Sequence, residues 1–337
     1  MGPYYRPIVI AECVYPAPAL PLAGGRLWFT HVERLTRCGT SEIVPVEQLP
    51  NNWKTRLCEK RSSIAEVSFD HPRIMGIVNV TPDSFSDGGK YNSVNSAVKH
   101  ANSLSWQGAD FIDIGGESTR PGSMPVFPEV EKEQIESVID NVRDLNTVIS
   151  VDTRKASVAE VAIACGASLV NDVSGFKFDP ELLPLCVAKA VPVCVMHSQG
   201  LPETMQKNPQ YEDVVLDVYD FLETQISLLI EAGISRTKII ADPGIGFGKT
   251  MEQNLALLEK LSLFHGLGVP LLLGVSRKGF IGKVTGVEKS EERVVGSVAA
   301  ALTGVSQGVQ IFRVHDVRET RQAFDMWQRI KFGESDG

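Results

Sequence analysis

Polar side chains that could bind a small molecule recur at the ends of apolar runs in this 337-residue chain. Asp152 follows the run VISV, Asn171 follows SLV, and Asp242 follows KIIA. Such groups are costly to bury without hydrogen bonds, so their repeated position indicates one shared site. Carboxylate and amide groups can make paired hydrogen bonds with the edge of a flat, nitrogen-rich ring.

Cationic side chains follow the last two apolar runs. Lys278 lies just after PLLLGVS, whereas Arg313 and His315 lie within the run VQIFRVHDV. Guanidinium, ammonium and imidazolium groups make charge-assisted hydrogen bonds with phosphate oxygens. The two sets of residues therefore predict a site for a heterocycle that carries a phosphate-bearing leaving group.

Two further residues bear on metal and nucleophilic chemistry. A hard divalent cation prefers oxygen ligands, and Asn79, after the run IMGIV, offers one. We expect Mg²⁺ there, held mainly by the diphosphate of a substrate. Ser276 stands beside cations without a GxSxG motif or an evident His-Asp pair, which argues against nucleophilic catalysis.

The segment DPGIGFGKT, residues 242–250, resembles a phosphate-binding P-loop. A P-loop has four residues between its first glycine and the Gly-Lys-Thr. Here only three residues separate Gly244 from Gly248, and Asp242 would repel a triphosphate. We therefore predict that the glycines allow a tight turn and that Asp242 is the functional residue.

These residues need a scaffold that brings distant strand ends together, and the chain has a suitable repeat. From Ile74 onward, short runs of Val, Ile and Leu alternate with amphipathic stretches, as expected for parallel strands covered by helices. The apolar runs occupy residues 74–80, 111–116, 148–153, 168–174, 191–198, 238–244, 270–276 and 309–317. The helical stretches occupy residues 95–107, 128–145, 155–165, 180–189, 212–232, 251–263, 290–304 and 317–331.

Eight such units over about 260 residues predict an α/β fold of the (β/α)8 TIM-barrel type. In this fold the active site lies at the carboxyl ends of the strands, and the loops after the seventh and eighth strands commonly bind phosphate. An open doubly wound sheet is the alternative, but the first strand lacks the glycines of a dinucleotide-binding turn. We assign residues 71–332 to the barrel and 333–337 to a C-terminal tail.

Residues 1–70 differ in texture from the barrel. They are rich in proline, and their one alternating run covers residues 27–32. We expect an N-terminal extension without a core of its own, either a short hairpin packed on the barrel or a partly disordered segment.

Composition excludes several classes of function. The net charge of −8 argues against a nucleic-acid binder or an anionic-membrane binder, and no apolar run has transmembrane length. The six cysteines lack metal-binding spacing and indicate reduced thiols in a cytoplasmic protein. We expect small molecules as the binding partners.

At the strand ends the sequence resembles the dihydropteroate synthase family of folate biosynthesis, over about residues 74–330. The motifs that carry the resemblance are GIVNVTPDSFSDGG (76–89), GADFIDIGGESTRPG (108–122), SVDT (150–153), NDVSG (171–175), DPGIGFGK (242–249), GVSRKGFIG (274–282) and RVHDV (313–317). The resemblance implies condensation of 6-hydroxymethyl-7,8-dihydropterin diphosphate with p-aminobenzoate. It also implies that diphosphate leaves first, so that the arylamine attacks a cationic pterin methylene.

The resemblance further implies a role for each matched residue. The pterin would be held by Asp152, Asn171, Asp242 and Lys278. The diphosphate would be bound by Asn79, Arg313 and His315, with Mg²⁺ on Asn79, and catalysis would rest on Asp152, Lys278, Arg313 and His315. The p-aminobenzoate site would be shaped by Thr119, Arg120, Pro121, Phe247 and Ser276. Loops 81–92 and 117–128 would close over the site and exclude water.

Alternative interpretations stay open for the protein and for single residues. A pterin-binding barrel that uses methyltetrahydrofolate, or a non-catalytic pterin-binding protein, would share part of the site. Asp113 could bind substrate or anchor a loop, and His197 could be a structural histidine. Asp172 and Asp316 are better explained as loop hydrogen-bond acceptors or helix caps than as direct ligands. Lys249 could be a solvated residue at the start of a helix.

An association between copies is also implied. The family is usually homodimeric, and the small residues of 295–304 would allow close helix packing against a partner. Tight packing of this helix on its own barrel is the alternative.

Overall fold

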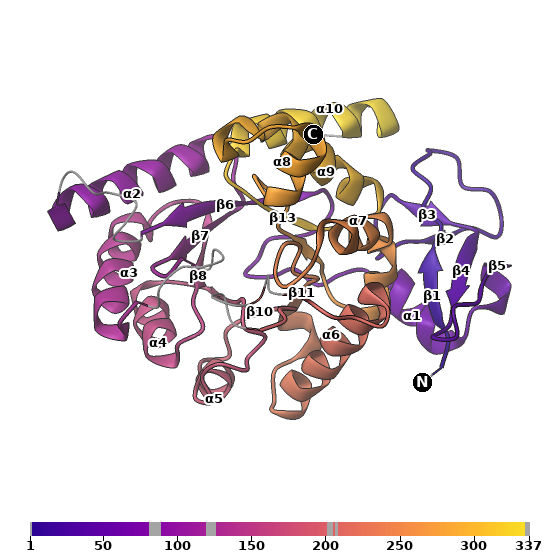
Figure 1. Cartoon of the computed structure of the whole chain (residues 1–337), viewed down its shortest axis with the longest axis horizontal. Coiled ribbons are helices and arrows are strands. Elements are labelled where there is room, and N and C mark those ends of the chain that lie inside the picture. The colour runs from indigo at the N-terminus through magenta and orange to yellow at the C-terminus, as the bar shows by residue number, and fades with distance from the viewer. Residues whose placement is uncertain (1, 81–88, 119–125, 201–204, 206–207, 334–337) are drawn as a thin grey trace.

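The computed structural model describes residues 2–80, 89–118, 126–200, 205 and 208–333. A barrel of parallel strands enclosed by helices forms its main body, with a smaller unit beside it (Figure 1). The barrel strands are β6 (Arg73–Asn79), β7 (Phe111–Gly115), β8 (Val148–Asp152), β9 (Leu169–Asp172), β10 (Val193–Met196), β11 (Ile239–Asp242), β12 (Leu272–Leu273) and β13 (Ile311–Val314). The helices are α2 (Gly89–Trp106), α3 (Pro128–Val142), α4 (Ala156–Cys165), α5 (Leu182–Lys189), α6 (Val214–Glu231), α7 (Met251–Glu259), α8 (Gly279–Thr285), α9 (Val294–Ser306) and α10 (Val317–Phe332).

The eight strands form a closed barrel. Hydrogen bonding joins them in the order β11, β10, β9, β8, β7, β6, β13, β12. The two ends of this order meet where Ala241 in β11 forms a parallel bridge with Leu271, beside β12. Because every neighbouring pair is parallel, the carboxyl ends of all eight strands lie at one end of the barrel. The predicted (β/α)8 barrel is confirmed.

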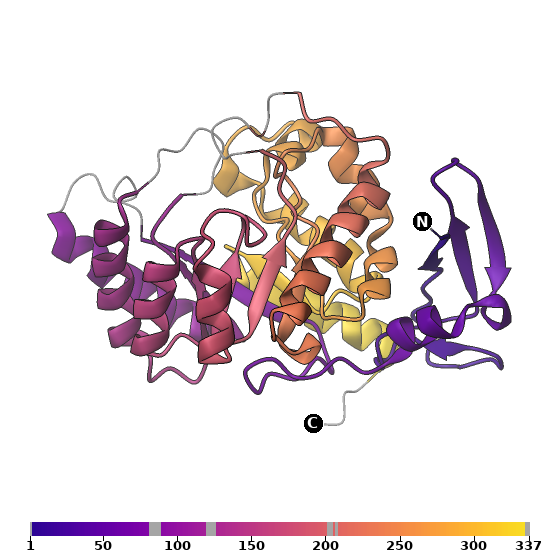
Figure 2. The ribbon, with the colours of Figure 1, turned by 90° about the horizontal axis from the view of Figure 1, so that it is seen from below.

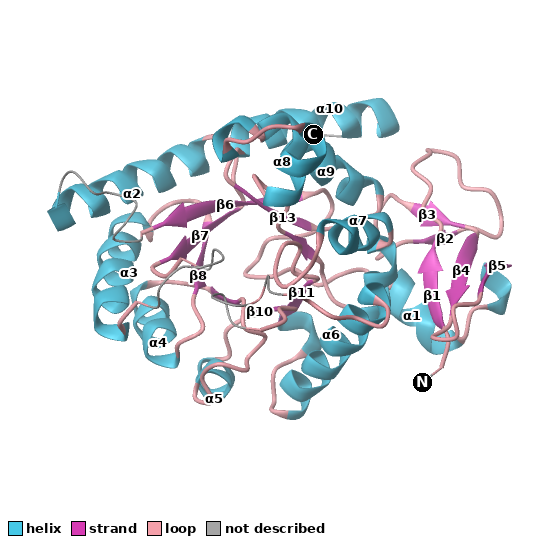
Figure 3. Cartoon of the chain, viewed as in Figure 1, coloured by secondary structure: helices cyan, strands magenta, loops and turns pink. Residues whose placement is uncertain are grey.

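Successive side chains of each strand enter two different hydrophobic layers. Ile74 and Val170 pack outward against the helices, whereas their neighbours Met75 and Leu169 fill the barrel interior. Since both faces of the sheet are buried, the strands appear in the sequence as nearly continuous apolar runs. Figure 3 shows the helices arranged around the strands.

The amino-terminal end of the barrel is filled by the segment that precedes β6. Ile64 is 1% exposed and packs with the interior cluster. A bridge between Ile64 and Val67 shapes the turn. Figure 2 shows this segment running beneath the barrel from the extension toward β6. The extension is therefore continuous with the barrel core.

The smaller unit contains five short strands and a helix. A three-stranded antiparallel sheet has the order β1–β4–β5, and β2 pairs with β3. The bounds are β1 (Tyr4–Pro7), β2 (Leu20–Pro21), β3 (Trp28–Phe29), β4 (His31–Leu35), β5 (Ser41–Pro45) and α1 (Asn51–Cys58).

The expectation that residues 1–70 have no core of their own is wrong. Phe29, Val32, Val44 and Leu57 belong to a separate cluster of buried side chains inside the unit. The strands are two to five residues long, so each contributes only one or two inward side chains. No periodic pattern is long enough to reveal this core in the sequence, because the core arises from pairing between the strands.

Two local features also differ from the sequence expectations. The helix α8 was not expected, because its seven residues include two glycines and show no helical periodicity. The apolar stretch after α7 continues as a 3₁₀ helix, Leu261–Leu267, rather than as part of α7.

Among the described residues, no helix combines the length and the apolar character that a membrane span requires.

Candidate active site

Arg313 is at the centre of the charged side chains at the carboxyl ends of the strands. Its Nε donates to Oδ2 of Asp113 at 2.6 Å, and its Nη2 donates to Oδ2 of Asp152 at 2.7 Å. Both carboxylates are buried. Three strands, β7, β8 and β13, thus bring one cation and two anions together inside the barrel, where their charges compensate one another.

Asp113 accepts hydrogen bonds from more side chains than Arg313 alone. Its carboxylate also accepts a hydrogen bond from the Ser150 hydroxyl at 2.6 Å and from the Asn171 side-chain amide at 3.0 Å. The side chain is 0% exposed. Because three donors converge on this buried carboxylate, the structure favours its role as an anchor that orients Asn171 and Arg313.

Asp152 has an altered acidity. Burial raises the pKa of its carboxyl to about 7, against the opposing effect of Arg313 and with a further contribution from Asp113. The neighbouring strand supplies Gly115, where an added Cβ would lie 3.3 Å from Cβ of Asp152. The absence of a side chain at position 115 therefore leaves room for Asp152 at the strand end.

Asp242 ends β11 and begins a tight loop. Its Oδ1 accepts the backbone N–H of Gly244 at 2.7 Å, and burial raises the pKa of its carboxyl. Gly244, Gly246 and Gly248 all have positive φ. A Cβ on Gly244 would lie 1.9 Å from the carbonyl oxygen of His197, so glycine is required by both conformation and space.

Lys249 is buried rather than solvated, so the interpretation as a solvated helix-start residue is wrong. Its Nζ contacts Nδ1 of His197 at 2.9 Å and donates to the carbonyl oxygens of Gly244 at 2.8 Å and Phe247 at 3.0 Å. The side chain is 3% exposed, and burial lowers its pKa to about 7. Lys249 thus fixes the loop from inside and joins it to His197, which favours a structural role for His197.

The start of α7 does not resemble a phosphate site. Thr250 and Gln253 form a reciprocal capping box, in which each side chain bonds the backbone N–H of the other residue. The N–H of Gly246 donates to the side-chain oxygen of Asn254 at 2.7 Å. These contacts satisfy N–H groups that a P-loop would direct at phosphate.

Lys278 and Phe247 meet across the mouth of the barrel. The ammonium of Lys278 lies 4.2 Å from the centre of the Phe247 ring. A Cβ on Gly246 would lie 3.2 Å from Cδ of Lys278, so the glycine lets the two loops approach closely. The loop after β12 therefore packs on the loop after β11.

Ser276 and His315 join the loops after β12 and β13. The Ser276 hydroxyl oxygen accepts the backbone N–H of His315 at 3.1 Å and lies 3.0 Å from its Nδ1. Depending on the tautomer, the Ser276 hydroxyl either donates to Nδ1 of His315 or accepts from it. In both cases the contact fixes the orientation of the imidazole ring.

Two acidic residues with open interpretations have structural contacts. Asp316 pairs with Arg277, whose Nε donates to it at 3.0 Å, and it makes no side-chain cap at α10. Asp172 accepts the backbone N–H groups of Ser174 at 2.7 Å and Phe176 at 2.6 Å. Both are loop acceptors, as one of the two interpretations expected.

A buried group of ion pairs beside the site did not emerge from the sequence. Glu117, after β7, accepts from Arg154 at 2.8 Å and lies 3.0 Å from Lys155, while Lys155 pairs with Glu131 at 2.6 Å. Burial raises the pKa of Glu117, but its bonds to Arg154 and Lys155 outweigh burial and hold the pKa below its usual range. The sequence did contain a signal for these ion pairs, because charged residues directly follow strand ends in GGES (115–118) and DTRK (152–155).

Known proteins match this chain over the barrel that carries these residues. A family profile described as pterin binding enzyme matches residues 75–315. Dihydropteroate synthase from Neisseria meningitidis serogroup B is 47% identical over 270 residues, which cover 79% of this chain and 95% of that protein. The Escherichia coli K12 enzyme is 45% identical, over 76% of this chain and 91% of the relative. The chain belongs to the dihydropteroate synthase family.

Solved structures of dihydropteroate synthases support the same assignment. The Xanthomonas albilineans enzyme with 4-aminobenzoic acid matches with a TM-score of 0.75 and 44% identity, over 79% of this chain and 95% of that one. A structure of that enzyme in complex with 7,8-dihydropteroate has a TM-score of 0.73 and 42% identity, over 81% and 99% of the two chains.

Most predicted site residues of this chain lie at the strand ends or in the loops after them. Asn79 is half-buried at the end of β6, in register with Gly115, which itself pairs with Asp152. Thr119, Arg120 and Pro121 lie outside the described residues.

No ready-made carboxylate cage for Mg²⁺ occurs at the strand ends within the described part of the chain. Among the described residues, the group with metal-ligand spacing is Glu136, Asp140 and Cys165, which lie on the outer helices α3 and α4. Its two carboxylates are exposed, and such acidic groups are common without an ion.

Proposed function

We propose that this chain condenses 6-hydroxymethyl-7,8-dihydropterin diphosphate with p-aminobenzoate, giving 7,8-dihydropteroate and diphosphate. The observation that carries the proposal is the buried arrangement in which Arg313 joins Asp113 and Asp152 at the strand ends. It offers negative charge for a cationic centre and positive charge for an anionic leaving group in one small volume.

The pterin is proposed to lie among Asp152, Asn171, Asp242 and Lys278. Asp242 is fixed by Gly244, and Asn171 is fixed by Asp113, so both present defined polar atoms to a ring edge. A carboxylate facing an N–H and an exocyclic amine makes a bidentate pair. Lys278 lies beside Phe247 and would donate to the ring oxygen and nitrogen.

The reaction is proposed to be dissociative. The bond between the pterin methylene and the diphosphate oxygen breaks, and its electron pair leaves with diphosphate. Arg313 and His315 stabilise that negative charge, and Arg313 has further N–H donors beyond its two carboxylate bonds. Asp152 stabilises the positive methylene carbon. The amine nitrogen of p-aminobenzoate then forms the new C–N bond and loses a proton.

Mg²⁺ is proposed to bind with the diphosphate. The side-chain oxygen of Asn79 is a suitable hard ligand at the end of β6, and substrate oxygens would supply most of the others. When bound, the metal would neutralise charge that develops on the leaving group.

The p-aminobenzoate site is proposed to include Phe247, Ser276 and the segment Thr119–Pro121. Phe247 is half-buried beside Lys278, and Ser276 is fixed by His315. An aromatic ring next to the loop after β12 suits a flat arylamine. Closure of loops 81–92 and 117–128 stays a prediction, since large parts of both lie outside the described residues.

A homodimer is also proposed. Val295 on α9 is 83% exposed, and α9 carries small residues on which a second copy could pack. Sedimentation would test this proposal, with a monomer as the contrary result. The cytoplasmic location stays a prediction.

The test of the proposed function is direct. The purified chain is mixed with pterin diphosphate, Mg²⁺ and p-aminobenzoate, and diphosphate and dihydropteroate are quantified. We expect both products in equal amounts, and no dihydropteroate when p-aminobenzoate is replaced by benzoate, which lacks the attacking amine. This mixture contains no methyl donor and no corrinoid partner. If the chain releases no diphosphate in it, the methyltetrahydrofolate alternative is favoured instead.

A further inference from the structure

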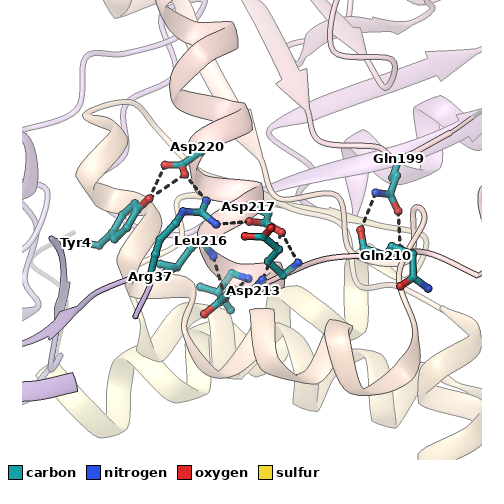
Figure 4. A network of polar contacts seen from close by, with 10 residues as sticks. Tyr4, Arg37, Gln199, Gln210, Asp213, Leu216, Asp217 and Asp220 are labelled. Atoms are coloured by element: carbon teal, nitrogen blue, oxygen red, sulfur yellow. Dashed lines mark hydrogen bonds and ion pairs between the residues drawn. The ribbon is translucent and has the colours of Figure 1, made fainter. Parts of the chain in front are cut away.

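Arg37 joins the N-terminal extension to α6 (Figure 4). Its Nη1 donates to Oδ1 of Asp217 at 2.6 Å, and its Nη2 pairs with Asp220. The hydroxyl of Tyr4, from β1, donates to the same Asp220 at 2.8 Å. Residues more than 170 positions apart in the sequence therefore meet at the first turns of α6.

Asp217 connects Arg37 to the backbone that precedes α6. Its second oxygen, Oδ2, accepts the backbone N–H of Glu212 at 2.9 Å and that of Asp213 at 3.4 Å. Asp213 in turn caps α6 by accepting from Val215 at 2.9 Å. One carboxylate thus holds both the guanidinium of Arg37 and the backbone that precedes α6.

The segment before α6 supports the loop 242–250. The hydroxyl of Tyr211 donates to the carbonyl oxygen of Gly248 at 2.7 Å. The side chain of Gln199 makes two hydrogen bonds with the backbone of Gln210, at 2.9 and 3.2 Å. A Cβ on Gly248 would lie 2.6 Å from the carbonyl oxygen of Gln199, so the loop rests closely on this segment.

We propose that Arg37 is a positioning residue for the second substrate's site, acting through Asp217, the Glu212–Asp213 backbone and Tyr211 on Gly248 and the adjoining Phe247. The inference rests on the function proposed above, because that function places Phe247 at the p-aminobenzoate site. The extension then influences the binding of p-aminobenzoate without touching it.

Attachment of the extension does not depend on Arg37 alone. Trp53 of α1 stacks on Tyr219 of α6 with ring centres 5.7 Å apart, and the hydroxyl of Ser262 donates to the carbonyl oxygen of Pro7 at 2.8 Å. Ile64 is buried beneath the barrel. Removing the Arg37 guanidinium therefore breaks the link to Asp217 while the extension stays in place.

Arg37→Gln is the test variant, and Arg34→Gln is the matched control. Arg34 lies on β4, and its ion pair with Glu42 stays within the extension sheet. We expect Arg37→Gln to raise KM for p-aminobenzoate about three- to ten-fold, within the range by which substitutions along a contact network alter a distant site. Its kcat and its KM for the pterin should change less than about two-fold, and Arg34→Gln should match the wild type.

Hydrogen exchange supplies a readout that is independent of activity. The amides of residues 208–213 should exchange faster in Arg37→Gln than in Arg34→Gln, because Asp217 is no longer held. Tyr211→Phe removes only the hydroxyl that bonds Gly248 and should reproduce the rise in KM. Unchanged exchange in Arg37→Gln, or an unchanged KM in Tyr211→Phe, overturns the proposal. If the wild type releases no diphosphate, the proposed function fails. The hydrogen-exchange comparison still tests whether the contact between Arg37 and Asp217 holds residues 208–213 in place.

Discussion

At the scale of single residues, the site depends on charges that are buried together. Arg313, Asp113 and Asp152 are each costly to bury alone, and their short contacts offset part of that cost. Removing one of the three side chains leaves the buried charge of the others uncompensated. A substitution should therefore cost more free energy of unfolding than the loss of a single hydrogen bond. Asp113 is the clearest case, since it accepts from three side chains.

Asp113→Asn should be strongly destabilising. The amide presents an NH₂ group toward donors and leaves Arg313 with one carboxylate, so we expect a loss of about 3 kcal/mol in the free energy of unfolding. Misplacement of Asn171 and Arg313 should lower kcat/KM about 100-fold. Urea denaturation and steady-state kinetics measure both effects. Ser150→Ala, which removes one neutral donor, should cost only about 1 kcal/mol, and an equal cost for the two variants would contradict the anchoring role.

The pH dependence should report Asp152. Its pKa of about 7 in the folded protein lies above the ordinary value for aspartate. Its contribution to stability is therefore fully present below about pH 4 and is lost as pH rises through 7. Activity has the opposite dependence, because the proposed role needs the carboxylate, so kcat/KM should fall as pH drops below about 7.

Asp152→Asn tests the stability side of this prediction. The difference in unfolding free energy between wild type and variant should change between pH 5 and pH 8 in urea titrations, with the wild type losing stability relative to the variant as pH rises. A difference that is constant over this range would show that the folded-state pKa is ordinary.

At the scale of elements, each barrel strand ends in a loop whose shape is set by local contacts. The loop after β11 combines positive-φ glycines with the buried Lys249, and its two ends are Asp242 and the capping box of α7. The loops after β12 and β13 are joined by Ser276 and His315. The atoms proposed to bind substrate are thus placed by loops that support one another.

Gly244→Ala should disrupt the loop after β11. The substitution combines a left-handed backbone with a Cβ at 1.9 Å from a carbonyl oxygen, and we expect a loss of about 3 kcal/mol in stability. Weaker pterin binding in calorimetry should accompany it, because the N–H of Gly244 fixes Asp242. Gly274→Ala is the control, since nothing lies within 4 Å of its added Cβ. Equal behaviour of the two variants would show that the loop adapts freely.

At the scale of the whole molecule, the extension and the barrel share packing. Trp53 stacks on Tyr219, and Ile64 closes the interior cluster at the amino-terminal end of the strands. The extension also has its own small core. The two units should therefore unfold together, although each has a separate cluster.

Ile64→Ala should destabilise the barrel itself. The side chain is 1% exposed, and its removal leaves a cavity below the strands, with an expected loss of about 3 kcal/mol. Urea unfolding followed by circular dichroism and tryptophan fluorescence should give one coincident transition. Ile43→Ala, at a side chain 67% exposed on β5, should stay within about 0.5 kcal/mol of wild type. Two separate transitions for the wild type would contradict shared packing.

The sequence was most informative where a single pattern decides the structure. Strands buried on both faces give apolar runs, and a polar residue such as Asp152 or Asp242 at the end of a run identifies the strand end. Contacts between distant loops leave no such pattern. The burial of Lys249 depends on the path of two loops, and the extension core depends on the pairing of strands that are individually too short to recognise.

Pterin binding by Asp242 is the most decisive part of the proposed function. The most direct measurement is calorimetric titration of Asp242→Asn with the pterin diphosphate, with Glu160→Gln on the exposed face of α4 as control. We expect binding to weaken at least about 100-fold, because a charged bidentate contact is lost, while the melting temperature and the control stay close to wild type. Binding within about three-fold of wild type by a folded Asp242→Asn protein would contradict the account.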